Sequence, residues 1–162
     1  MSFIKTDTKE KKHLGLRIAL IGLMSLILTA CGASIRERSK VEDPQEVGQI
    51  VPVNDNGQYV DILAQELDSM LEKKDFFFAN VHIPYEGEIP DTDAFIPFDQ
   101  VAEFLDAFPE DKDAKIVLYC RSGSMSATSA RELVNLGFTN VYNLDGGFRA
   151  WSAAGYDFIA PE

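Results

Sequence analysis

Cys120 is the residue in this chain whose surroundings best suit it to chemistry. It follows Ile116–Tyr119, an apolar run that starts with β-branched residues and predicts a short strand buried on both faces. Small polar residues come next, and from Ser124 apolar residues recur at helical spacing as far as Gly137. A strand, a tight loop and a helix N-terminus direct backbone N–H groups and the positive end of a helix dipole toward the loop. A thiol placed there is expected to lose its proton readily and to act as a nucleophile.

The alternative is that Cys120 is a small buried hydrophobe at the end of a strand, since free cysteine is among the most buried residue types. We favour the nucleophile because of the four residues after the cysteine. A purely structural strand end would not lead into polar or glycine residues that open a helix, here Arg121, Ser122, Gly123 and Ser124.

Two motifs resemble those of single-domain rhodaneses. Residues 119–126, Tyr-Cys-Arg-Ser-Gly-Ser-Met-Ser, resemble the active-site loop of that family, in which a Cys-x-x-Gly-x-Arg pattern follows a strand. Leu144–Trp151 resembles the family's closing Gly-Gly-x-x-x-Trp signature. The resemblance covers residues 58–160. It implies sulfur transfer, in which Cys120 carries a sulfane sulfur as a persulfide and the loop after it holds that sulfur: Arg121, Ser122, Gly123, Ser124, Met125 and Ser126.

The chain departs from the family pattern at three places. Met125 stands where related enzymes tend to have arginine, and Asn80 and His82 stand where an aspartate and an arginine are usual. Losing one charge-assisted contact to an anion costs about 1.5–3 kcal/mol, or roughly ten- to a hundredfold in affinity. We therefore expect weak use of thiosulfate and a preference for less charged donors such as organic persulfides or polysulfide, unless Arg121 or Arg149 compensates.

His82 has two interpretations. It could border the catalytic pocket, together with Arg149, and orient a substrate or stabilise the thiolate. Alternatively it replaces the family's arginine in a structural hydrogen bond to the loop. We favour the structural role, because a lone histidine is more often a satisfied structural residue.

The loop that begins at His82 is acidic. The spacing of its acids matches no calcium-binding loop, so a solvated acidic surface is the expected interpretation of Glu86, Glu88, Asp91 and Asp93. We expect no metal and no cofactor.

Two other functions remain as alternatives. Dual-specificity phosphatases and arsenate reductases share a loop of this architecture, but they need an arginine six places after the cysteine, where this chain has Ser126. The second alternative is a non-catalytic rhodanese-like module that binds a protein or carries a persulfide. The altered Asn80, His82 and Met125 favour such a module, whereas Cys120 with its Arg-Ser-Gly continuation disfavours it.

The amino terminus has the pattern of a bacterial lipoprotein signal peptide. Five Lys and Arg residues precede the apolar run Ile18–Leu28, which is too short to span a bilayer alone. Leu28-Thr-Ala-Cys31 resembles a lipobox, so we expect cleavage before Cys31 and lipidation of its thiol. An uncleaved membrane anchor is the alternative. Residues 1–30 are thus interpreted as signal peptide, 31–57 as a lipidated flexible tether, and 58–160 as the rhodanese-like domain, on the periplasmic or cell-surface face of a membrane.

The charge balance excludes some partners. Without residues 1–30 the chain keeps 10 basic and 24 acidic side chains, a net charge of −14, which disfavours nucleic acid as a partner. Cys120 would be its only free thiol, and a lone thiol in an oxidising compartment suggests reactivity. The expected partners are a sulfane sulfur donor and a thiol acceptor, for example a thioredoxin-like protein, for a monomeric enzyme.

Strands alternate with helices along residues 58–160. This order predicts an α/β fold with a central parallel sheet, helices on both faces, and a site at the carboxyl ends of the strands. Trp151 is expected to be a core anchor. The expected elements are a weakly indicated strand at Gln49–Val53, a helix through Leu63–Leu71, a strand at Phe76–Val81, a loop at His82–Asp93, a helix from Asp99 to Phe108, a strand at Asn140–Leu144 and a short helix at Phe148–Ala154.

Overall fold

The computed structural model describes residues 47–55 and 57–161. The predicted signal peptide, Cys31 and the first part of the predicted tether lie outside these ranges. Within them, every helix is too short or too polar to cross a membrane.

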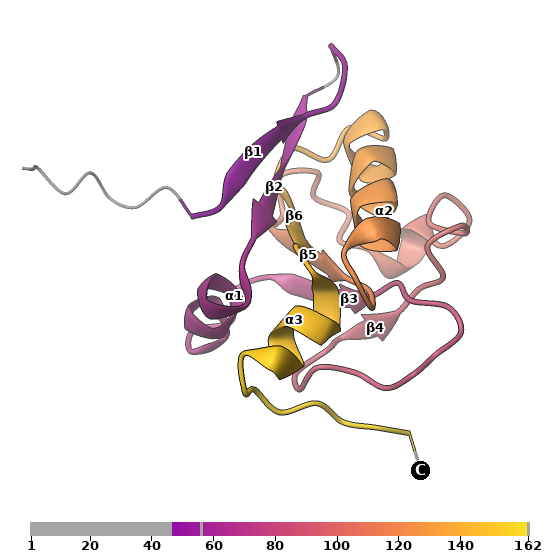
Figure 1. The fold of residues 1–162 in the computed structure, drawn as a ribbon. Helices are drawn as coiled ribbons and strands as arrows, with labels where there is room; N and C mark the ends of the chain where they lie inside the picture. Colours follow the sequence, from indigo (N-terminus) through magenta and orange to yellow (C-terminus); the bar gives the residue numbers. More distant parts are fainter. Residues whose placement is uncertain (1–46, 56, 162) are drawn as a thin grey trace, which may run out of the picture. The chain divides into compact units, whose positions relative to one another are not determined.

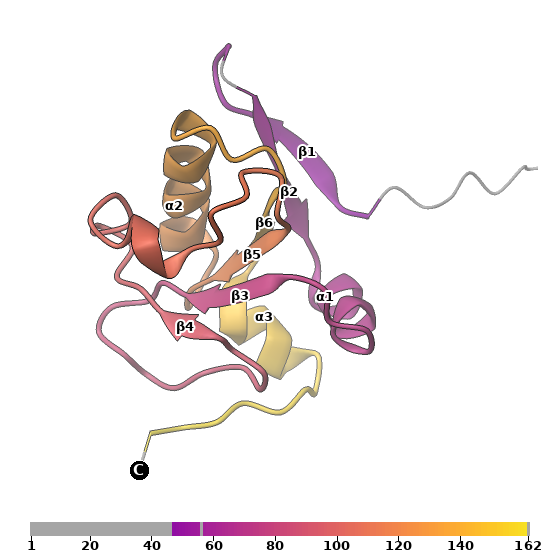
Figure 2. The ribbon, with the colours of Figure 1, turned by 180° about the vertical axis from the view of Figure 1, so that it is seen from behind.

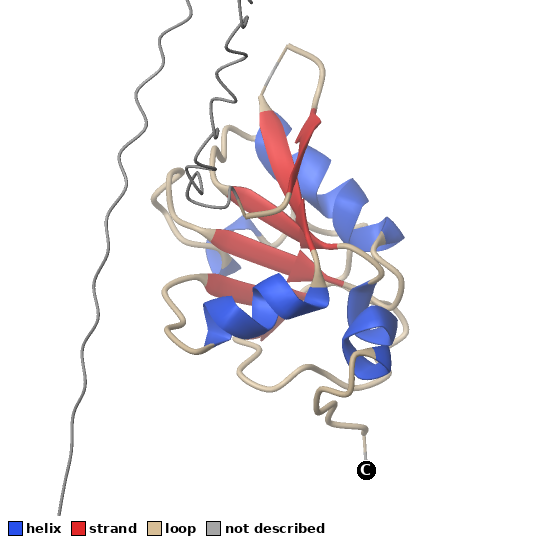
Figure 3. Ribbon diagram, turned by 60° about the vertical axis from the view of Figure 1, so that its left-hand side comes forward, coloured by secondary structure: helices blue, strands red, loops and turns tan. Residues whose placement is uncertain are grey.

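Six strands form one sheet in the order β1-β2-β6-β5-β3-β4 (Figure 1). All neighbouring pairs are parallel except β1 and β2, which pair antiparallel. Figure 3 shows β1 and β2 as a hairpin that extends beyond the other strands. The strands are β1 (Gln49–Pro52), β2 (Gln58–Ile62), β3 (Phe77–Asn80), β4 (Ala94–Phe95), β5 (Ile116–Tyr119) and β6 (Val141–Leu144). The predicted α/β class with a central parallel sheet is confirmed.

Strand β5 lies in the interior of the sheet and is buried on both sides, as its unbroken apolar run predicts. Its side chains alternate between two separate cores. Ile116 and Leu118 belong to the core under α2, and Val117 and Tyr119 to the core on the other face. A strand placed in this way has a fixed register, so the position of the residue after it, Cys120, is also fixed.

Helices cover both faces of the sheet. Helix α2 (Ser124–Asn135) packs on one face through Ala130, Leu133 and Val134, and Figure 2 shows the segment that contains η1 (Leu105–Ala107) beside it. Helices α1 (Ala64–Leu71) and α3 (Gly147–Ala153) pack on the opposite face. Trp151 is buried in that second core and its indole N–H donates to the carbonyl of Asp157 at 2.7 Å, which confirms it as a core anchor.

The folded unit begins earlier than the predicted domain boundary at residue 58, and the weakly indicated strand at Gln49–Val53 is confirmed as β1. Gln49–Pro52 is a strand of the sheet, paired with β2 from Gln49↔Asp61 to Pro52↔Gln58. The prediction of a flexible tether that continues to residue 57 is therefore wrong for these residues. Strand β2 itself was not anticipated, because only the helical spacing after it was recognised.

The helix predicted from Asp99 to Phe108 is also wrong. This segment consists of turns followed by the short 3-10 helix η1. The carbonyl of Pro97 accepts from Gln100 N–H, and later hydrogen bonds mostly join residues three apart, so no regular α-helical ladder forms. The apolar residues that suggested a helix, Val101 and Phe108, are nevertheless buried against the same core as α2.

Candidate active site

Cys120 is the first residue after β5, and helix α2 begins four residues later. Gly123 precedes the helix with φ of +85°. A side chain at Gly123 would also bring its Cβ to 3.0 Å from the backbone nitrogen of Gly146. The turn thus needs glycine for two reasons, its left-handed backbone and the close approach of the chain after β6.

The start of α3 holds the Cys120 loop through backbone hydrogen bonds. Phe148 N–H donates to the carbonyl of Cys120 at 2.9 Å, and Arg149 N–H donates to that of Arg121 at 3.2 Å. Gly147, with φ of +57°, is so close that a Cβ there would overlap the carbonyl oxygen of Cys120. The glycine pair of the closing motif thus brings the chain directly against the Cys120 loop.

The sulfur of Cys120 is buried. The residue is 1% exposed and lies in the core under α2, as the structural alternative for this cysteine requires. Its surroundings are not purely apolar, however. The hydroxyl of Ser126, itself fully buried, lies 3.4 Å from Sγ and 3.2 Å from the carbonyl of Gly123, and its single proton can be donated to either acceptor. A donor this close can stabilise an anionic sulfur.

The loop also offers unpaired backbone donors. Within the described ranges, no acceptor in the protein takes a hydrogen bond from the N–H groups of Arg121, Ser122 or Gly123. The first N–H groups of α2, which begins at Ser124, lack acceptors inside the helix. Ala127 N–H is the first to bond back, to the carbonyl of Gly123 at 2.9 Å. The loop can therefore hold an anion without a side-chain base.

The segment after β3 forms the second side of the site. Asn80, fully buried, donates from Nδ2 to the carbonyl of Gly87 at 2.9 Å and accepts from His82 N–H at 3.0 Å. Further along, Ile89 N–H donates to the hydroxyl of Tyr119 at 3.0 Å, and that hydroxyl also bonds Thr92. Burial raises the pKa of Tyr119 above its ordinary value of 10.0, so the hydroxyl stays neutral and keeps both bonds even in alkaline solution.

The side chain of His82 is buried against the first turn of α3. Its ring meets that of Phe148 edge-on at 5.5 Å between centroids. Neither ring nitrogen makes a hydrogen bond in the part of the chain that the structure describes. The expected structural hydrogen bond from the ring to the loop is therefore wrong. The nearest charged group is Glu86, whose Oε2 lies 3.5 Å from Nε2.

Glu86 is the residue at this site that sequence analysis missed. Its Oε1 lies 3.3 Å from Nη1 of Arg121, so the acidic loop reaches the residue next to the cysteine. Met125 is half-buried against the core of α2 and supplies no charge. Arg149 is exposed and forms no ion pair with any described residue.

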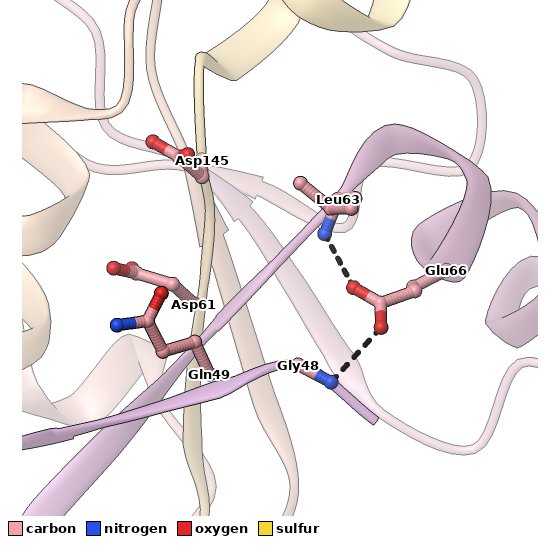
Figure 4. Close-up of a pocket in the computed structure, with 6 residues that line it drawn as sticks. All are labelled: Gly48, Gln49, Asp61, Leu63, Glu66 and Asp145. Atoms are coloured by element: carbon pink, nitrogen blue, oxygen red, sulfur yellow. Dashed lines mark hydrogen bonds between the residues drawn. The ribbon is translucent and has the colours of Figure 1, made fainter. Parts of the chain in front are cut away.

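A separate pocket of about 190 Å³ lies where β1, β2 and α1 meet (Figure 4). It includes no residue of the Cys120 loop. Its carboxylates already have partners: Glu66 accepts from the N–H groups of Gly48 and Leu63, Asp61 from Asn143, and Asp145 from Gly146 N–H. The hydrogen bonds of these acids stabilise the start of α1 and the ends of the strands. None of the described residues that line the pocket carries a positive charge.

Residues 63–154 match the family model described as "Rhodanese-like domain". This match covers more than half of the chain. The chain belongs to the rhodanese-like domain family.

Curated relatives of this rhodanese-like chain include sulfurtransferases. It is 31% identical to a "Sulfurtransferase" of Allochromatium vinosum over 109 residues, covering 62% of this chain and 99% of that protein. It is 37% identical to the "Thiosulfate sulfurtransferase GlpE" of Pseudoalteromonas translucida over 95 residues, covering 57% and 87%. A "tRNA uridine(34) hydroxylase" of Hamiltonella defensa is 35% identical, but the match covers 56% of this chain and only 27% of that protein. These similarities support a sulfurtransferase-type activity.

Solved structures show the same fold. A rhodanese-related protein from Thermoplasma volcanium aligns with a TM-score of 0.53 at 25% identity, covering 61% of this chain and 96% of that one. A rhodanese-like domain protein from Staphylococcus aureus aligns with a TM-score of 0.50 at 27% identity, covering 60% and 95%.

Proposed function

We propose that this rhodanese-like protein is a sulfurtransferase that carries sulfane sulfur as a persulfide on Cys120 and passes it to a thiol. The observation that carries the proposal is the surroundings of Cys120. A hydroxyl group lies within hydrogen-bond distance of its sulfur, and the loop that leads into α2 has N–H groups without an acceptor in the described part of the protein. A persulfide is an anion, and backbone donors at a helix N-terminus stabilise an anion.

The reaction has two displacement steps. In the first, the Cys120 thiolate attacks the outer sulfur of the donor, a sulfur–sulfur bond forms, and the donor's own sulfur–sulfur bond breaks. The donor's remainder leaves with the electron pair, as sulfite from thiosulfate or as a thiolate from an organic persulfide. In the second, an acceptor thiolate attacks the outer sulfur and the Cys120 thiolate leaves.

Burial of Sγ constrains how this occurs. A persulfide places its outer sulfur about 2 Å beyond Sγ. The acceptor therefore attacks an atom that lies farther out than the buried sulfur of the free enzyme. Arg121, Ser122 and Ser124 are exposed and form the rim that a donor first meets.

The test is intact-protein mass spectrometry after incubation with thiosulfate or with glutathione persulfide. We expect the wild-type protein to gain the mass of one sulfur atom and to lose it again when a thiol is added. The Cys120→Ser variant should show no gain in mass. A thiol that stays unmodified with both donors would support the non-catalytic binding module, which the burial of Cys120 also favours.

We further propose that the protein is a lipoprotein anchored through Cys31 on the outer side of a membrane, with a thiol protein of that compartment as acceptor. The support is the sequence pattern of residues 1–31. Metabolic labelling with an alkyne fatty acid should tag the wild-type protein and not Cys31→Ser. The proposal would be contradicted if the wild-type protein, like the Cys31→Ser variant, took up no label and still contained residues 1–30.

A further inference from the structure

We propose that Glu86 determines donor specificity by occupying Arg121, so that this site selects sulfane donors of low charge, such as organic persulfides, over doubly charged thiosulfate. This inference rests on the function proposed above and names the substrate class of the same site.

The first observation is that one carboxylate contacts two parts of the site. Oε1 of Glu86 lies 3.3 Å from Nη1 of Arg121, the residue directly after the cysteine. Oε2 lies 3.5 Å from Nε2 of the buried His82. Glu86 comes from the segment after β3 and Arg121 from the loop after β5, and these strands are neighbours in the sheet.

The second observation is that the structure holds the chain on both sides of Glu86. The next residue, Gly87, is held by Asn80 Nδ2 on its carbonyl. Glu88 pairs with Ile159 through backbone hydrogen bonds in both directions. His82, on the other side, packs on Phe148. The backbone at Glu86 is therefore held in place, and its side chain, 38% exposed, lies at the rim beside Arg121.

The third observation is the charge of the rim. Arg121 paired with Glu86 contributes no net charge, and Met125 contributes none. The described residues as a whole contain seven Lys and Arg against nineteen Asp and Glu. Arg149 is the cation near the loop that has no ion-pair partner among the described residues. A doubly negative donor thus meets a neutralised Arg121 at the rim and a negative surrounding field, which favours donors with a single charge or none.

The expected size of the effect depends on exposure. Arg121 is 49% exposed and Glu86 38%, so solvent screens their interaction. Ion pairs between partly exposed side chains change an equilibrium constant, such as that for binding, by up to about fivefold. Removing the acid without removing the arginine should therefore change the preference between donors about three- to fivefold.

The experiment measures kcat/KM for thiosulfate, which carries two negative charges, and for cysteine persulfide, whose net charge is −1 because its ammonium offsets its carboxylate, with a common thiol acceptor. In Glu86→Gln we expect the value for thiosulfate to rise about three- to fivefold and that for the persulfide to change less than about twofold. The matched control is Glu88→Gln, which removes the same charge from the same segment but from a side chain that contacts Tyr85 instead of Arg121. It should leave the donor ratio unchanged. The gain in Glu86→Gln should shrink as salt increases.

A second variant tests the role of Arg121. In an Arg121→Gln background, Glu86→Gln should lose most of its gain for thiosulfate, because no guanidinium is left to be released. The inference is overturned if Glu86→Gln and Glu88→Gln shift the donor ratio alike, or if Glu86→Gln changes both donors by the same factor. Absence of persulfide on Cys120 with either donor in the wild type would instead overturn the proposed function itself.

Discussion

The two sides of the Cys120 site are built by different means. The Cys120 loop is held by backbone: α3 N–H groups bond the carbonyls of Cys120 and Arg121, and glycines at 123 and 147 permit the close approach. The segment from His82 to Thr92 is held by side chains, mainly Asn80 and Tyr119. The glycines at 123 and 147 cannot be replaced without strain, because their backbone is left-handed and other chain atoms lie close. A contact made by a side chain can be replaced by a different contact when that residue changes. The first side keeps the glycines of the family motifs and departs from the pattern at Met125, and the second side carries the other two departures, Asn80 and His82.

The largest effect is expected on the backbone side. Gly147→Ala should destabilise the protein by about 3 kcal/mol or more, because its Cβ would overlap the carbonyl of Cys120 at a left-handed backbone position. Urea unfolding measures this. The control is Gly137→Ala, which has φ of +92° and open space around the added Cβ, and should cost only about 1–2 kcal/mol. Equal losses at both positions would mean that close packing against the loop is unimportant.

On the side-chain side, Asn80→Ala should cost about 2–3 kcal/mol, because a buried carbonyl and a buried N–H both lose their partner. Asn140→Ala, which removes one exposed hydrogen bond to the carbonyl of Asp113, is the control and should cost less than about 1 kcal/mol. Chemical denaturation of both variants gives the difference. A loss at Asn80 no larger than at Asn140 would show that the segment after β3 does not depend on side-chain contacts.

Tyr119→Phe should cost about 1–2 kcal/mol at neutral pH through loss of the bonds to Ile89 and Thr92. It should also change the pH dependence of stability. Burial raises the pKa of Tyr119 above its ordinary value of 10.0, so above that pH the unfolded chain loses the proton and the folded one keeps it. The free energy of unfolding should fall as the pH rises past 10.0, and less steeply in Tyr119→Phe. Identical slopes would place the hydroxyl in contact with solvent.

The smallest effect concerns the sulfur. Ser126→Ala removes the hydroxyl that can donate to Sγ, so alkylation of Cys120 and its persulfidation should slow about two- to fivefold. Ser129→Ala is the control, since Ser129 is equally buried on α2 but bonds the carbonyls of Phe98 and Met125. Stopped-flow alkylation with iodoacetamide measures both. If Ser129→Ala slows the reaction as much, the effect comes from packing of α2 and not from the hydrogen bond.

The sequence by itself determined the features that depend on neighbouring residues. The apolar run of β5, the turn at Gly123 and the start of α2 at Ser124 all result from local sterics and periodicity. The prediction of a helix at 99–108 failed because the same apolar residues are buried equally well by turns and a 3-10 helix.

Only the tertiary structure decided which residues meet the Cys120 loop. Glu86 and Arg121 are 35 residues apart and come together because β3 and β5 are adjacent in the sheet. The burial of the sulfur and the entry of Gln49–Pro52 into the sheet likewise depend on long-range packing. Sheet order is set by how whole faces are buried, and no local pattern of residues specifies it.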